Sequence, residues 1–230
     1  MDRGLFLMHA PPVQDLRRGT ILCTIAHAIF VASNPTLAYE VSWDGPNYLR
    51  NDSMGTRGVV TLKNDALIGA FSDIHSSRSP FRVGEKQYDL NMFFRGIEPN
   101  LFSTAQVETL SYLTEEYHQK AAPTVTSAFW SSGDYLVGAE SWDTILENGA
   151  HLIKIELLPT HEAIPLIEDD YEFNAKQVGL LKSLFRRRMG SESPLTLTFD
   201  ELQVLFAQGR EGIDASKTLL KSINISLGVI

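Results

Sequence analysis

Residues 56–73, TRGVVTLK-ND-ALIGAFSD, decide the fold because they describe a single β-hairpin. Thr56–Lys63 and Ala66–Asp73 are rich in apolar and β-branched residues, which favour strands. Asn64-Asp65 between them suits a two-residue hairpin loop. Neighbouring apolar residues such as Val59-Val60 replace strict alternation, a pattern typical of strands that are covered on both faces. We therefore expect this hairpin to lie at the centre of a sheet rather than at its edge.

Strand patterns predominate before Pro165 and helix patterns after it. Helices are expected at 15–33, 104–120, 142–148, 174–189, 198–208 and 214–225, and further strands at 39–43, 87–94, 124–131, 135–139 and 152–158. This order predicts an α+β protein with a mostly antiparallel sheet, packed helices and a helical C-terminal region. We expect an α+β core domain over residues 1–165, with the N-terminal helix and the sheet, and a helical region over 166–230 packed on it as one unit.

The composition is that of an ordinary globular protein. The chain has 230 residues, of which 43% are hydrophobic and 21% are charged, so disorder is not expected. Its single cysteine, Cys23, excludes an intrachain disulfide and a cysteine-rich zinc site, and fits a reducing compartment. The formal net charge of -8 argues against nucleic-acid binding, because the chain repels phosphate.

Residues 17–38 have two interpretations. Arg17-Arg18 precede an apolar run, and Thr36-Leu37-Ala38 has the small residues of a cleavage site, so the segment has the order of a secretory signal or anchor. Against this, polar residues recur along the run at helical spacing, at Thr20, Thr24 and His27. We therefore expect a packed amphipathic helix in a soluble, cytoplasmic protein without membrane contact. Export through a signal or anchor at 17–38 is the alternative.

No motif in the sequence identifies a reaction. The chain has no glycine-rich phosphate loop, no G-x-S-x-G nucleophile turn, no H-E-x-x-H zinc motif and no calcium loop. We therefore expect no cofactor and no metal ligands, and leave open whether the protein is an enzyme. Cys23 and His27 lie four residues apart and could form a reactive pair on one helix face. Their apolar surroundings favour a buried, unreactive cysteine instead.

Polar residues near the expected strand ends are the first candidates for a small-molecule site. The candidate catalytic residues are Asp73, His75 and Arg78, and the candidate ligand-binding residues are Asp44, Tyr48 and Arg57. Together they offer a base, a cation and an aromatic wall, which suit proton transfer or the binding of a small anion. A network of polar loop side chains that holds the strand ends together explains the same pattern and is favoured.

The charge distribution is more specific than any motif. Residues 136–175 contain nine carboxylates and one base, Lys154, and this excess of eight equals the whole formal net charge. The fifteen residues that follow contain five bases and no acid. Helix dipoles explain both clusters if the acids precede a helix and Arg186–Arg188 end it. The alternative is an acidic face that attracts a basic protein partner.

We expect a non-enzymatic binding or interaction protein that uses this acidic face. Its candidate partner-binding residues are Glu162, Glu168, Asp169, Asp170 and Glu172. The alternative is an enzyme or small-anion-binding protein of unrecognised type that uses a polar cleft at the strand ends.

Overall fold

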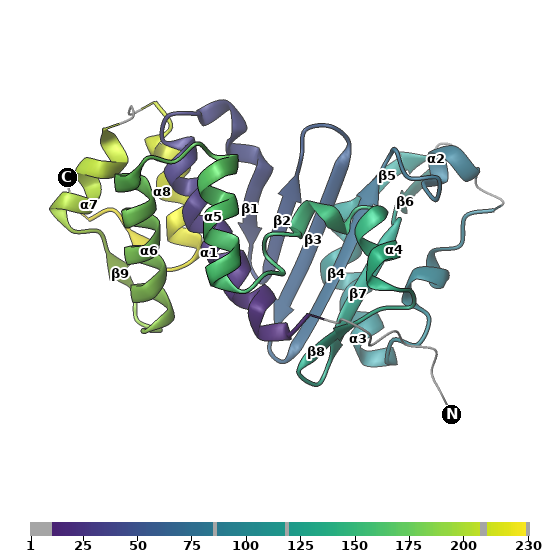
Figure 1. Cartoon of the computed structure of the whole chain (residues 1–230). Coiled ribbons are helices and arrows are strands. Elements are labelled where there is room, and N and C mark those ends of the chain that lie inside the picture. The colour runs from purple at the N-terminus through teal and green to yellow at the C-terminus, as the bar shows by residue number, and fades with distance from the viewer. Residues whose placement is uncertain (1–10, 85–86, 118–119, 208–210, 229–230) are drawn as a thin grey trace. The chain divides into compact units, whose positions relative to one another are not determined.

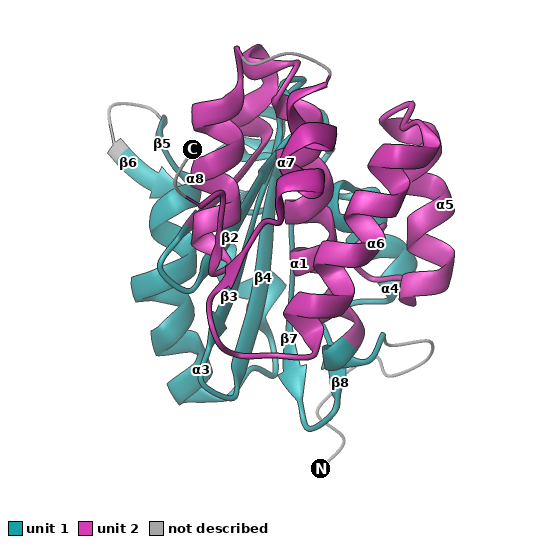
Figure 2. Cartoon of the chain, turned by 90° about the vertical axis from the view of Figure 1, so that its left-hand side faces the viewer, with its two compact units in different colours: residues 1–14, 44–154 teal, residues 15–43, 155–230 magenta. Residues whose placement is uncertain are grey.

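The computed structural model describes residues 11–84, 87–117, 120–207 and 211–228, and Figure 1 shows the course of the chain. The chain forms two compact units, each built from two segments: unit 1 from residues 1–14 and 44–154, and unit 2 from 15–43 and 155–230 (Figure 2). The predicted boundary between 165 and 166 stays a prediction, because grouping in space does not show which segments fold independently.

The main sheet confirms the predicted α+β class. Its strand order is β1-β2-β3-β4-β7-β8, and the pairings of β2, β3, β4, β7 and β8 along it are antiparallel. The strands are β1 (Val41–Asp44), β2 (Asn47–Asn51), β3 (Thr56–Lys63), β4 (Ala66–Asp73), β7 (Ser127–Ser132) and β8 (Tyr135–Val137). β3 and β4 pair over their full length, from Thr56 opposite Asp73 to Lys63 opposite Ala66. The predicted hairpin and its central position are therefore both correct.

Both faces of the central hairpin are covered within unit 1, which explains its lack of alternation. On one face Val59, Ile68 and Trp130 join a hydrophobic cluster with the segment that follows β4. On the other face Phe71 and Phe129 lie towards helix α4 (Trp142–Glu147). Figure 2 shows helix α3 (Pro99–Thr104) and α4 on opposite sides of the sheet.

Two phenylalanine rings lie directly on glycines of the neighbouring strand. Phe71 is paired with Gly58 and Phe129 with Gly69. A Cβ atom built on Gly69 would come within 2.3 Å of the Phe129 ring, and one on Gly58 within 2.5 Å of the Phe71 ring. The two ring centroids are 5.9 Å apart, and Trp142 of α4 lies 5.3 Å from Phe129. The absence of a side chain at the glycines thus makes room for an aromatic row under α4.

Three segments between residues 87 and 158 differ from the sequence predictions. Residues 87–94 contain a 3-10 helix rather than a strand, and the helix expected over 104–120 ends at Leu113 and gives way to a strand. The segment 152–158 is not a strand, because Ala150, Ile153 and Leu157 are buried at the three- to four-residue spacing of helical turns. The remaining elements of unit 1 are α2 (Pro80–Val83), η2 (Leu90–Phe94), η3 (Ala105–Thr109), η4 (Leu110–Leu113), β5 (Thr114–Tyr117), β6 (Lys120–Pro123) and η5 (Ala150–Ile153).

Unit 2 is almost entirely helical. It contains η1 (Pro35–Glu40), α5 (Thr160–Asp170), α6 (Ala175–Met189), α7 (Phe199–Phe206), α8 (Ile213–Ser222), the two-residue strands β9 (Leu195–Thr196) and β10 (Ile225–Ser226), and all of α1 (Val13–Val31) after its first two residues. The capping box predicted at Thr198 and Glu201 opens α7, and a second one at Asn174 and Gln177 opens α6. The predicted C-terminal helices are therefore confirmed.

Helix α1 is buried on nearly all sides, and the polar stripe of the expected packed helix is buried as well. Its polar stripe is not solvated: Thr20, Thr24 and His27 are fully buried. The Thr24 hydroxyl donates to the Thr20 carbonyl and accepts from Trp43 Nε1 at 2.9 Å, so the stripe satisfies its polar groups inside unit 2. The backbone of Glu156 packs directly on Gly19, where a Cβ would come within 2.0 Å of the carbonyl oxygen. No helix among the described residues is both long and apolar enough to span a membrane.

We predict that Gly69→Ala destabilises the protein, because the added methyl group must displace the Phe129 ring. The expected loss in free energy of unfolding is about 1–3 kcal/mol, as for other overpacked cores. Gly179→Ala is the matched control, since Gly179 lies on an exposed part of α6 with no atom within 4 Å of the new Cβ. It should stabilise by up to about 1 kcal/mol through helix propensity. Urea unfolding measures both, and an unchanged midpoint for Gly69→Ala would contradict the packing described.

Candidate functional site

The strand-end candidates in unit 1 lie in separate contacts. Arg57 pairs with Glu115, and Arg78 pairs with Glu140. Asp44 accepts a hydrogen bond of 2.6 Å from the Tyr112 hydroxyl. Each of these charged side chains therefore already has a partner outside the candidate set.

The other three candidates are placed differently from one another. Tyr48 is fully buried in β2 and forms part of the core. Asp73 is 7% exposed, and its carboxylate accepts the backbone N–H of His75 at 2.7 Å. The exposed His75 ring donates from Nε2 to the Met54 carbonyl oxygen at 3.0 Å. The structure thus brings Asp73 and His75 together only through the backbone. This is the geometry of a network that ties strand ends together, and the catalytic and ligand-binding roles stay predictions.

Asp52 organises the neighbouring loop and was not identified from the sequence. Its carboxylate accepts the backbone N–H groups of Met54 and Thr56 at 2.8 and 2.9 Å. Burial raises the pKa of Asp52, but these hydrogen bonds outweigh it and the net shift is downward. The turn-forming residues 51–55 were the available signal. The loop is a structural feature that holds Met54 outward, with 75% of that residue exposed.

A second group of candidates lies along one helix of unit 2 and in the turn after it, and we call this group the acidic corner. It consists of Glu162, Glu168, Asp169, Asp170 and Glu172, all of them exposed. The first four lie on α5, a helix that the sequence interpretation missed because Pro165 was treated as a boundary. Pro165 instead lies inside α5. Glu172 lies in the turn between α5 and α6. The candidate partner-binding residues are therefore held by one helix and the turn that follows it.

Four of the five carboxylates of the acidic corner occupy unfavourable places, the exception being Glu162 in the first turn of α5. Glu168, Asp169 and Asp170 are in the last turn of α5, where the helix dipole disfavours anions. Glu172 has φ 52°, a left-handed conformation that costs a residue with a Cβ atom about 1–2 kcal/mol. It also precedes the start of α6, where an anion is favoured, but this effect falls off within one turn. The helix-dipole explanation thus covers Glu162 in the first turn of α5 and Glu172 before α6, but not the three acids in the last turn of α5.

An aromatic anchor fixes the acidic corner to the interior of unit 2. Tyr171, between Asp170 and Glu172, donates its hydroxyl to His27 Nδ1 at 3.2 Å and stacks on Phe30 with ring centroids 4.7 Å apart. The other ring nitrogen of His27 lies 3.0 Å from the Leu37 carbonyl oxygen, which can only accept. Nε2 therefore carries the proton of the neutral ring, and Nδ1 is the acceptor for Tyr171. The carboxylates beside Tyr171 are consequently presented by a fixed turn.

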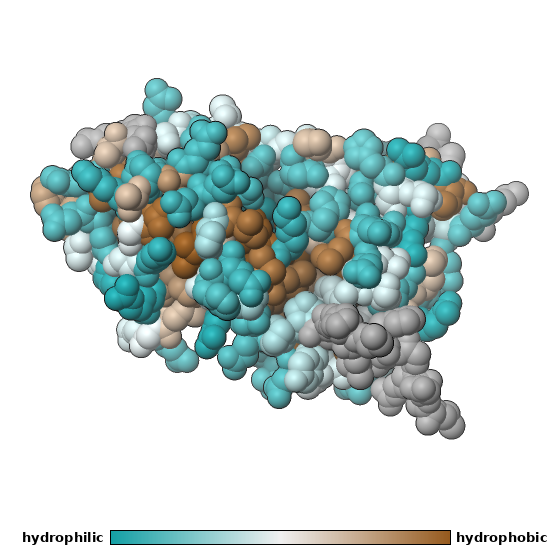
Figure 3. Space-filling model, viewed as in Figure 1, coloured by the Kyte–Doolittle hydropathy of each residue, from teal (hydrophilic) through white to brown (hydrophobic). Residues whose placement is uncertain are grey.

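Three members of the acidic corner line an open hollow of about 580 Å³. Glu168, Asp169 and Glu172 line it together with Pro165 and Phe173. Figure 3 shows hydrophilic residues over the outer sides of α5 and α6, with hydrophobic residues between the two helices. Carboxylates around an apolar floor match the chemistry of a lysine or arginine side chain, which has an aliphatic stem and a cationic end.

The other acids of the 136–175 stretch do not belong to this surface. Glu140 is paired with Arg78, and Glu156 is buried with 1% exposed. Asp143 and Glu147 lie on α4 of unit 1. The acidic corner therefore contains only five of the nine acids in residues 136–175.

The basic end of α6 has structural partners. Arg187 pairs with Glu201 of α7 at 2.6 Å and also donates to the Thr196 carbonyl, while Arg188 donates to the Ser191 carbonyl. These contacts join α6 to the segments that follow it. They use two of the three arginines for packing rather than for an anionic ligand.

Among the described residues, no group of three or more histidine, cysteine, aspartate or glutamate side chains is placed to hold a metal ion. Cys23 is buried in α1. No protein-family model, curated protein or solved structure matches the chain.

We predict that the contacts of Glu201 stabilise the protein at neutral pH and not in acid. Burial raises the pKa of Glu201, but hydrogen bonds from the Thr198 backbone, Arg187 and Ser183 outweigh this and lower it below 4.5. Because the folded-state pKa is the lower one, the stabilisation is present above the ordinary pKa and is lost as the pH falls through the folded value. Glu201→Gln should therefore lower the free energy of unfolding at pH 7, with a difference from wild type that shrinks as the pH falls below the ordinary pKa of 4.5. Urea unfolding across this range measures it, and a pH-independent difference would contradict the assignment.

Proposed function

We propose that the protein is a non-enzymatic interaction protein whose acidic corner binds a basic protein partner. The observation that carries the proposal is the placement of the carboxylates. They are exposed, none forms an ion pair with a lysine or arginine in the described part of the chain, and three of them oppose the dipole of their own helix. Charges that lower the stability of the free protein are expected where a partner compensates for them.

The hollow suggests how the partner is recognised. A lysine or arginine side chain would lay its stem on Pro165 and Phe173 and bring its charge to Glu168, Asp169 and Glu172. The fixed turn at Tyr171 supports this proposal, because a surface that is already ordered loses little entropy on binding. Complementary charge also accelerates association with a basic surface.

We place this interaction in the cytoplasm, where the buried Cys23 stays reduced. The competing possibility is export through residues 17–38. N-terminal sequencing of the protein from its native host distinguishes the two. An intact start at Met1 or Asp2 is expected, and a start after Ala38 would overturn this part of the proposal.

The test of the acidic corner combines stability with binding. Glu168→Gln, Asp169→Asn and Asp170→Asn are introduced together, which removes three charges from the C-terminal turn of α5 with little change in shape. The control variant is Glu116→Gln, Asp134→Asn and Glu147→Gln, which removes three exposed charges from unit 1. Both triple variants have the same net charge, so any difference between them in stability or affinity depends on where the removed carboxylates lie.

We expect the acidic-corner variant to unfold at a higher temperature than wild type, by an increment worth about 1 kcal/mol. Its affinity for a labelled lysine- and arginine-rich peptide, measured by fluorescence anisotropy at low salt, should fall on the order of tenfold through the loss of several exposed ion pairs. The control variant should stay within about twofold of wild type. Equal losses in both variants would mean that net charge alone attracts the peptide, and a destabilised corner variant would mean that the carboxylates are structural; either result would overturn the proposal.

A further inference from the structure

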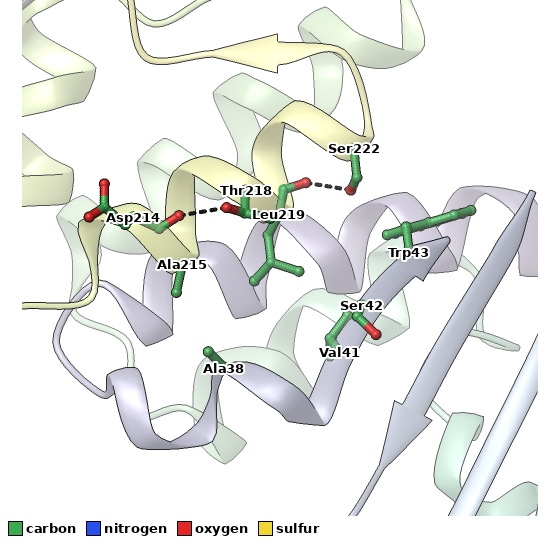
Figure 4. Close-up of a pocket in the computed structure, with 9 residues that line it drawn as sticks. All are labelled: Ala38, Val41, Ser42, Trp43, Asp214, Ala215, Thr218, Leu219 and Ser222. Atoms are coloured by element: carbon green, nitrogen blue, oxygen red, sulfur yellow. Dashed lines mark hydrogen bonds between the residues drawn. The ribbon is translucent and has the colours of Figure 1, made fainter. Parts of the chain in front are cut away.

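A second hollow of unit 2 lies between α8 and the segment formed by η1 and β1 (Figure 4). It is a groove of about 350 Å³, within the size range of small-molecule sites. Its described lining consists of Ala38, Val41, Ser42, Trp43, Asp214, Ala215, Thr218, Leu219 and Ser222. None of these residues belongs to the acidic corner, so the groove is a separate feature.

The walls of the groove favour an aliphatic occupant. Ala38 and Val41 on one side approach Ala215 and Leu219 on the other (Figure 4). The polar residues of α8 do not change this character, because their hydroxyls bond back to their own helix. Thr218 donates to the Asp214 carbonyl at 2.8 Å, and Ser222 donates to the Leu219 carbonyl at 2.6 Å. A ligand therefore gains affinity here mainly by removing apolar surface from water.

Trp43 gives the groove a fixed end. Its indole Nε1 donates to Thr24 Oγ1 of the buried helix α1 at 2.9 Å, which sets the orientation of the ring. The side chain is only partly buried, whereas Trp130 and Trp142 are almost fully buried in unit 1. Trp43 is thus both a wall of the groove and its natural fluorescent reporter.

The charge of Asp214 determines which head group of a ligand the groove favours. Asp214 is the charged residue among the nine lining residues, and it is exposed in the first turn of α8. In Figure 4 its carboxylate points away from the apolar side chains, so it lies at the rim rather than inside the groove. The positive end of the helix dipole amounts to roughly half a charge, so it offsets only part of the carboxylate. The described lining residues therefore carry a net negative charge, which Asp214 supplies. It repels a carboxylate head group and attracts an ammonium.

We propose that this groove binds a small aliphatic ammonium ligand, with its chain between α8 and the η1–β1 segment and its charged end beside Asp214. The chain supplies most of the affinity. The exposed carboxylate supplies a modest preference for the cation, because ion pairs in contact with water are weak and screened by salt.

The experiment titrates the full-length protein with octylammonium, octanol and octanoate and follows Trp43 fluorescence. All three should give saturable changes through their common chain, and octylammonium should bind about three- to fivefold more tightly than octanoate at low salt. This preference should disappear in 0.5 M salt. Absence of any saturable change up to the solubility limit, or octanoate binding as tightly as octylammonium, would refute the proposal.

Three variants separate the groove from its surroundings. Ala215→Leu fills the groove and should weaken all three ligands at least fivefold. Asp214→Asn should keep octanol binding and remove the preference for octylammonium. Asp200→Asn is the matched control, since Asp200 is an exposed acid in the first turn of α7 that does not line the groove, and it should leave the preference unchanged. Wild-type binding by Ala215→Leu, or loss of the preference in Asp200→Asn, would also refute it. No outcome bears on the acidic corner, because none of its residues is altered.

Discussion

The contact of two phenylalanine rings with glycines on the adjacent strand determines how the main sheet packs. Phe71 lies over Gly58 and Phe129 over Gly69, so two residues without side chains leave space for two large ones. The rings form a row that continues to Trp142 and supports α4. The opposite face carries the main hydrophobic cluster through the alternate residues of the same strands. A one-residue slip in register would separate the rings from their glycines and exchange the two faces. The pairs therefore help to specify the register as well as the packing.

The parts of the fold that were predictable from sequence depend on local chemistry. The 56–73 hairpin has its loop residues and its β-branched runs in place, and α7 begins at the capping box that the sequence displays. The wrong predictions concern segments whose sequence pattern fits two kinds of secondary structure, so that contacts with distant residues decide between them. The segment 152–158 has an apolar pattern that suits a strand or a helical turn, and the left-handed Gly149 before η5 favours the turn. Helix α5 was not predicted because proline is disfavoured in the interior of a helix. Pro165 nevertheless lies inside α5.

The candidate sites also divide into features that the local sequence predicts and features that depend on distant contacts. Counting charges along the sequence was enough to find the acidic corner, because its members lie within eleven consecutive residues. The same count did not show that three of these acids oppose the dipole of α5. That conflict depends on where α5 ends, and the sequence did not predict this helix. The strand-end candidates failed to meet because Arg57, Arg78 and Asp44 have nearer partners that come from segments 58 to 68 positions away along the chain. The groove beside Trp43 depends entirely on α8 lying against residues 38–43, and nothing in either segment alone predicts it.

The division of unit 2 into two segments has a consequence for synthesis of the protein on the ribosome. Helix α1 emerges before residues 44–154, but its contacts with Glu156, Tyr171 and Gly212 must wait until that whole stretch has been made. During that interval α1 has none of its native partners from residues 155–230, although nearly every side of it is buried in the folded protein. Unit 1 is contiguous apart from its first residues and can form its hairpin-based sheet meanwhile. The nascent chain thus passes through a stage in which α1 lacks the native contacts that bury it. The time needed to translate residues 44–230 sets how long that stage lasts.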